Sequence, residues 1–79
     1  MRNVYLVRFE TVRAFSTARK CIEFVKRAYD GAEFGPWGEE VSINDVPTEK
    51  LITMWNKGEY LSAGLGGHDR VEFFKEEVQ

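Results

Sequence analysis

The sequence of 79 residues predicts a small α+β domain, with a mixed or antiparallel sheet of three to four strands and two helices on one face. Three observations predict this class. The first 30 residues contain neither Gly nor Pro and change from a strand-like to a helical pattern. A second helical pattern follows a loop rich in Gly. Two strand-like segments, residues 59–63 and 71–78, then close the chain as a hairpin around a glycine-rich turn. We expect the order strand, helix, strand, helix, strand, strand in a single domain over residues 1–79.

Residues 3–9 are rich in β-branched and aromatic side chains, which is typical of a strand. Apolar residues occur at both odd and even positions of this segment. A strand that is apolar on both faces favours an interior place in its sheet. The strand pattern runs on toward Phe15, and we expect a bulge near residues 10–11 to carry it there.

Residues 17–30 have the strongest helical pattern in the chain. Ser16 or Thr17 is a suitable N-cap, and Gly31 stands where a helix-ending glycine belongs. Phe24 lies off the apolar stripe, so we expect it at the flank of the core or in solvent. The stripe itself comprises Ala18, Cys21, Ile22, Val25, Ala28 and Tyr29.

The middle of the chain predicts a loop, a short strand and a second helix. Three glycines and a proline crowd residues 31–38, which indicates a loop, and residues 40–44 alternate like a strand. The second helix should have Pro47 near its first turn, Thr48 as a cap and Gly58 as its end. Its apolar face consists of Leu51, Ile52 and Trp55, and we expect Trp55 in the core.

Cysteine content and size favour self-association as a stabilising device. With a single cysteine and a single histidine, Cys21 and His68, the chain can form neither an internal disulfide nor a Cys/His zinc site. Small domains often add a second subunit instead, so a homodimer is a candidate state. The apolar run of residues 4–7 stops at Arg8, too early for a signal peptide or a membrane helix. We therefore expect a cytoplasmic protein with no membrane partner.

Enzyme chemistry has little support in the sequence. Cys21 and His68 form the only thiol–imidazole combination, yet Cys21 falls on the buried stripe and His68 in a glycine-rich turn. The adjacent carboxylates at residues 39–40 and 76–77 would point to opposite faces of a strand, which does not suit a catalytic pair. We assign no catalytic residue, no metal and no cofactor, and expect a protein that is not an enzyme.

Charge is distributed unevenly along a chain whose net charge is −2. Residues 1–30 carry seven basic and three acidic side chains, whereas residues 31–79 carry four basic and ten acidic ones. The basic half offers an alternative function, a nucleic-acid contact through the first helix. Glu23 lies four residues from both Arg19 and Arg27, and pairing there would reduce the free charge. The residues of this alternative are Arg13, Arg19, Lys20, Lys26 and Arg27.

The main functional prediction is a protein-binding surface around two aromatic residues in the glycine/proline loop, Phe34 and Trp37. Aromatic anchors among polar groups are typical of binding hot spots. The same two side chains could instead fold back onto the small core, and the sequence leaves this open. With the acidic residues of the loop and of the C-terminal hairpin, the predicted set is Phe34, Trp37, Glu39, Glu40, Glu72 and Glu76.

The N-terminal segment resembles one found in small, uncharacterised bacteriophage proteins. The likeness covers about residues 3–28. It consists of a Val-Tyr-Leu-Val strand that leads into Phe15-Ser16-Thr17 and a helix with Ala18, Phe24 and Val25. Phage proteins of this size are often inhibitors of one host protein, anti-defence factors among them. The resemblance thus implies an inhibitor or adaptor that acts by protein contact, and it transfers no functional residue.

Overall fold

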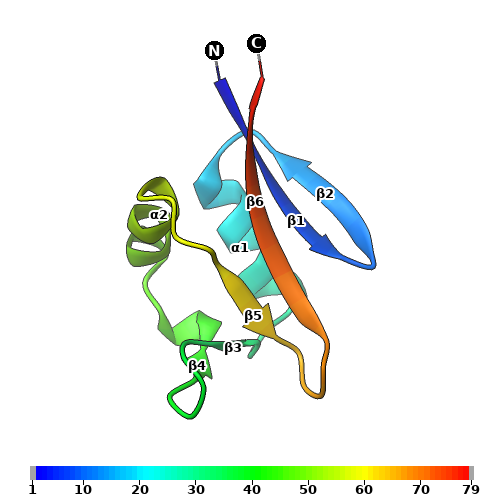
Figure 1. The fold of residues 1–79 in the computed structure, drawn as a ribbon, viewed down its shortest axis with the longest axis vertical. Helices are drawn as coiled ribbons and strands as arrows, with labels where there is room; N and C mark the ends of the chain where they lie inside the picture. Colours follow the sequence, from blue (N-terminus) through cyan, green and yellow to red (C-terminus); the bar gives the residue numbers. More distant parts are fainter. Residues whose placement is uncertain (1, 79) are drawn as a thin grey trace.

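The structure, a computed structural model, describes residues 2–78 and consists of one antiparallel sheet and two helices (Figure 1). In chain order the elements are β1 Arg2–Phe9, β2 Thr11–Phe15, α1 Ala18–Ala28, β3 Glu33–Phe34, β4 Val41–Ser42, a 3₁₀ turn Ile43–Asp45, α2 Thr48–Asn56, β5 Ser62–Gly64 and β6 Arg70–Val78.

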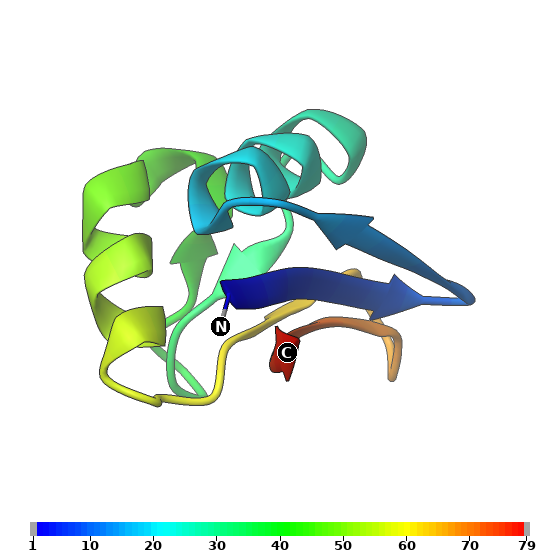
Figure 2. The ribbon, with the colours of Figure 1, turned by 90° about the horizontal axis from the view of Figure 1, so that it is seen from above.

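The sheet has the strand order β2-β1-β6-β5-β3-β4, and every neighbouring pair is antiparallel. The long strands β1 and β6 pair from Arg2 with Val78 to Arg8 with Glu72, which brings the two ends of the chain side by side. Both helices lie on the same side of the sheet (Figure 2). The predicted α+β class with two helices and an antiparallel sheet is confirmed, but the predicted number of strands is wrong, because the sheet has six.

One of the additional strands is β2, which forms a hairpin with β1 in place of the expected bulge. Phe9 pairs with Thr11 across Glu10, whose φ is +66°. A left-handed backbone costs a residue with a side chain about 1 kcal/mol, so such turns usually contain Gly or Asn. Neither residue is present here, and the sequence therefore did not indicate a turn. The apolar alternation of residues 3–15 therefore belongs to two antiparallel strands.

The other additional strand is β3, and the strand expected over residues 40–44 is limited to β4. The 3₁₀ turn that follows β4 places Asn44 beneath the end of α1. There the Asn44 Oδ1 accepts a hydrogen bond from the Gly31 amide (2.9 Å), and the Asn44 Nδ2 donates to the Lys26 carbonyl (3.1 Å). This side chain thus satisfies backbone groups that the helix end leaves open. Strands of two residues have no periodicity, so the sequence pattern could not reveal β3.

The predicted N-cap of α1 and the predicted end of α2 are confirmed, whereas α1 ends at Ala28, with Tyr29 as its C-cap, earlier than the predicted residue 30. The Thr17 Oγ1 caps α1 by accepting from the Lys20 amide (3.1 Å), and Gly58 follows α2 with φ +85°. Thr48, however, is the first residue of α2, because Pro47 occupies the N-cap position. A further correction concerns the stripe of α1, since Ala28 is exposed and only the stripe residues before it are fully buried.

The core lies between the helices and the sheet. Trp55 is buried, as predicted, and its ring packs edge-on against Tyr5 (5.1 Å between centroids) and Phe73 (5.3 Å). These contacts join α2 to the long strands β1 and β6. Phe24 packs at the flank, against Phe15 (5.2 Å) and near Tyr29. Within residues 2–78, neither helix has the length and apolar character needed to cross a membrane.

Candidate protein-binding surfaces

The thiol and the imidazole occupy different environments. Cys21 is fully buried in α1, and burial raises the pKa of its thiol to about 12. The thiol therefore stays protonated at neutral pH, and the protonated form is a poor nucleophile. His68 is exposed in the turn between β5 and β6. In the described part of the chain, no three His, Cys, Asp or Glu residues cluster as a metal site would require.

The structure divides the predicted protein-binding residues between two places. Phe34, Trp37, Glu39 and Glu40 belong to β3 and the loop between β3 and β4, which we call the Trp37 loop (residues 35–40). Glu72 and Glu76 lie on β6, on the far side of β5 from that loop (Figure 1). The six residues therefore do not form one patch.

Trp37 is the most exposed large apolar residue of the described chain, with 94% of its surface open to solvent. The loop that carries it is nevertheless held by internal hydrogen bonds. The Glu39 amide donates to the Pro36 carbonyl (2.9 Å), and the Gly38 amide donates to the Glu40 Oε1 (2.9 Å). The loop therefore presents the indole ring on a defined backbone.

Gly35 at the start of this loop and Phe34 just before it help to fix its backbone. Gly35 has φ +127°, and a Cβ there would lie 3.1 Å from the Glu39 carbonyl oxygen, so only glycine fits without rearrangement. Phe34 is half-buried and packs against the core. Of the two aromatics for which the sequence left both interpretations open, Phe34 thus contributes to the core and Trp37 does not.

The second surface is the side of the sheet opposite the helices. Side chains alternate between the faces of a strand. Tyr5, Val7 and Phe9 point to the core, so their neighbours on β1 point away from it. No described segment covers these neighbours (Figure 2). We call this surface the open face and define it as Arg2, Val4, Leu6, Arg8, Val12, Ala14, Arg70, Glu72, Phe74, Glu76 and Val78.

Apolar residues occupy the centre of the open face. Leu6 pairs with Ala14 on one side and with Phe74 on the other, which gives a row across three strands. Leu6 and Phe74 are only half-buried, and they do not belong to the core cluster. Val12 continues the apolar surface at the β2 edge with 59% exposure. In the sequence, this surface is indicated only by the apolar residues at even positions of residues 3–9.

A group of polar and aromatic side chains holds the open face next to this row. The Arg8 guanidinium donates to the Glu72 carboxylate (2.8 Å) and lies over the Phe74 ring (4.7 Å to its centroid). The Tyr60 hydroxyl donates to the other Glu72 oxygen (2.7 Å). The bond from Arg8 and then that from Tyr60 hold the pKa of Glu72 below its ordinary value of 4.5. The same bond to Glu72 raises the pKa of Tyr60 above 10.

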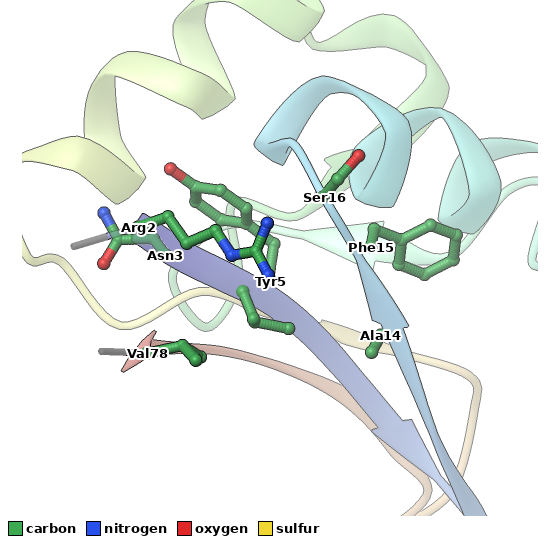
Figure 3. Close-up of a pocket in the computed structure, with 8 residues that line it drawn as sticks. Arg2, Asn3, Tyr5, Ala14, Phe15, Ser16 and Val78 are labelled. Carbon is green, nitrogen blue, oxygen red and sulfur yellow. The ribbon is translucent and has the colours of Figure 1, made fainter.

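A hollow of about 480 Å³ adjoins the open face where β1 begins and β2 ends (Figure 3). Val4, Ala14 and Val78 contribute apolar surface to it, and Arg2 supplies a cation at its rim. Tyr5 and Phe15, whose side chains pack against the core, also line it. The hollow therefore borders the open face at Val4 and Ala14 and includes residues from the helix side of the same strands.

Much of the basic set predicted for nucleic acid makes contacts within the chain. Lys26 turns toward α2, where its Nζ donates to the Val46 carbonyl (2.5 Å) and the Thr48 hydroxyl (3.1 Å). Arg19 forms an ion pair with Glu49 of α2, and the Arg13 guanidinium lies 5.1 Å from the centre of the Phe24 ring. The Lys20 Nζ lies 3.4 Å from the Ser16 hydroxyl, and Arg27 is exposed. The ion pairs recorded within residues 2–78 do not include the pairing expected for Glu23.

No protein-family model, curated protein or solved structure matches this chain.

Proposed function

We propose that this protein is a non-enzymatic binding module that acts by contact with a protein partner, and that the Trp37 loop makes the main contact. One observation carries the proposal: a loop with internal hydrogen bonds presents a tryptophan with 94% of its surface in water. Exposed aromatic anchors with a polar surround are the side chains that dominate protein interfaces.

The energetics favour a contact at this position. Burial of a whole tryptophan side chain removes about 200 Å² from water, worth about 5 kcal/mol before the costs of association. The Pro36 and Glu40 hydrogen bonds hold the loop before the partner arrives, so little ordering is needed on binding. Burial of the Trp37 side chain alone can therefore supply most of the binding free energy of an interface hot spot.

The surroundings of Trp37 indicate the charge of the partner. Glu39 and Glu40 follow the tryptophan and are exposed. Carboxylates at the rim of an interface favour a partner surface that is positive, and they accelerate the encounter. We propose an inhibitor or adaptor of the cytoplasm that meets a basic protein surface. The resemblance to phage inhibitors agrees with such a role toward one host protein.

The test uses a photo-crosslinking amino acid at position 37 in the full chain, added to an extract of the native host. The same amino acid at Glu23, which is exposed on α1 and belongs to neither the Trp37 loop nor the open face, is the control. A protein captured from position 37 is purified and titrated with the unmodified chain, Trp37→Ala and Glu23→Ala. We expect Trp37→Ala to weaken binding at least about tenfold and Glu23→Ala to change it less than about twofold.

Equal affinity of Trp37→Ala and the unmodified chain for every captured partner would contradict the proposal. So would a lower thermal midpoint of Trp37→Ala, because that would place the indole in the core. The nucleic-acid alternative predicts a different outcome, namely binding to mixed-sequence RNA or DNA that falls steeply with salt and loses slope in Arg27→Ala.

A further inference from the structure

We infer that the open face of the sheet is the interface of a homodimer, in which a second copy of the chain packs its own open face against the first. The two sheets would form a sandwich with the helices of each copy on the outside. The inference rests on the open face alone, and it does not depend on the Trp37 loop.

The open face has an apolar centre. Leu6, Phe74 and Ala14 form its central row, with Val4 and Val12 on neighbouring positions. In a two-layer domain this short the helices can cover only one side of the sheet. A second sheet is the element that covers the other side in sandwich folds, and it packs at about 10 Å.

The charges of the face identify the occupant as a second copy. In a two-fold interface the same surface faces itself, so a face of one sign would repel its partner. Here Arg8 and Glu72 stand side by side as an ion pair, with Glu76 four residues further along β6. This mixture suits contact with itself. It does not suit a nucleic acid, which requires a predominantly basic surface.

The proposed contact leaves the Trp37 loop free. Figure 1 looks onto the sheet, and the molecule measures 39 by 25 Å across this view. A dimer formed over β2, β1 and β6 would leave the Trp37 loop, which lies beyond β5, for the protein partner.

Sedimentation velocity of the full chain, from about 1 μM to 1 mM, tests the inference. We expect twice the chain mass of 9.2 kDa for the unmodified protein and for the control Val41→Glu, which places a charge on exposed β4. Leu6→Glu should give the single-chain mass. Ala14→Glu should do the same, and because Ala14 is exposed, this variant keeps the fold even if Leu6→Glu does not.

A second experiment exchanges the charges of the Arg8–Glu72 ion pair. Arg8→Glu alone leaves three carboxylates on the face and should shift the dissociation constant at least tenfold toward the monomer. Adding Glu72→Arg restores the original net charge of the face and should restore most of the dimer. A single-chain mass for the unmodified protein at every concentration would overturn the inference. So would a dimer that survives Ala14→Glu but dissociates in Trp37→Ala, or nucleic-acid binding that Ala14→Glu abolishes.

Discussion

Lys26 illustrates how a single residue can be assigned the wrong environment from its place in a pattern. On a helical wheel it falls with the solvated charges of α1, yet its ammonium reaches the Val46 carbonyl and the Thr48 hydroxyl at the start of α2. Long lysine stems can cross apolar surface to reach such acceptors. Position on the helical wheel gives only the direction in which a side chain leaves the helix. The acceptors of Lys26 belong to a segment about 20 residues away, and no local sequence pattern could place that segment next to α1.

We predict that Lys26→Met destabilises the fold by about 1 kcal/mol, because two hydrogen bonds to a charged donor are lost while the stem's packing is kept. Lys20→Met is the control, since Lys20 is exposed and its one side-chain contact is local, with Ser16 just before the same helix. Urea unfolding measures both. Equal midpoints for the two variants would show that Lys26 is a solvated residue after all.

At the level of elements, long periodic segments were predictable and short ones were not. The helix α1 and the strands β1 and β6 carry enough residues for period and caps to identify them. β3 and β4 have two residues each and exist because the hydrogen bonds of neighbouring strands are available to them. The group formed by Arg8, Glu72 and Tyr60 links β1, β6 and the segment before β5 in the same way, through contacts between residues that are distant in sequence.

The hydrogen bonds of Arg8 and Tyr60 to Glu72 lead to a prediction about stability in acid. Because Glu72 has a lowered pKa in the folded chain, its contribution is complete above its unfolded value near 4.5 and is lost as the pH falls through the folded value. The thermal midpoint should therefore drop less between pH 6 and about pH 3 in Glu72→Gln than in the unmodified chain. The pKa of Tyr60, followed by NMR, should also fall toward 10.

The control for this measurement is Glu76→Gln, on the same strand and face. Its pH dependence should follow that of the unmodified chain. If Glu72→Gln and Glu76→Gln gave the same acid profile, the hydrogen bonds from Arg8 and Tyr60 would not be contributing to the stability of the sheet.

For the whole molecule, the sequence identified the residue types of the binding surface but not how they are grouped. The Trp37 loop was predictable because its aromatics stand among glycines, a proline and acids. Its separation from Glu72 and Glu76 was not, because it depends on the strand order, which places β5 between them. The open face was visible only as a second apolar side of β1, and its lack of a covering layer is a property of the assembled fold.

The most direct test of the central claim, contact through Trp37, is ¹⁹F NMR of the chain labelled with 5-fluorotryptophan. Only two tryptophans are present, and Trp37→Phe assigns their signals. In the free chain, dimeric or not, the Trp37 signal should show the H₂O/D₂O isotope shift of an exposed ring, and Trp55 should show almost none. On saturation with the crosslinked partner, Trp37 should lose that shift while Trp55 stays unchanged. A saturated complex in which Trp37 keeps its full solvent shift would contradict the account.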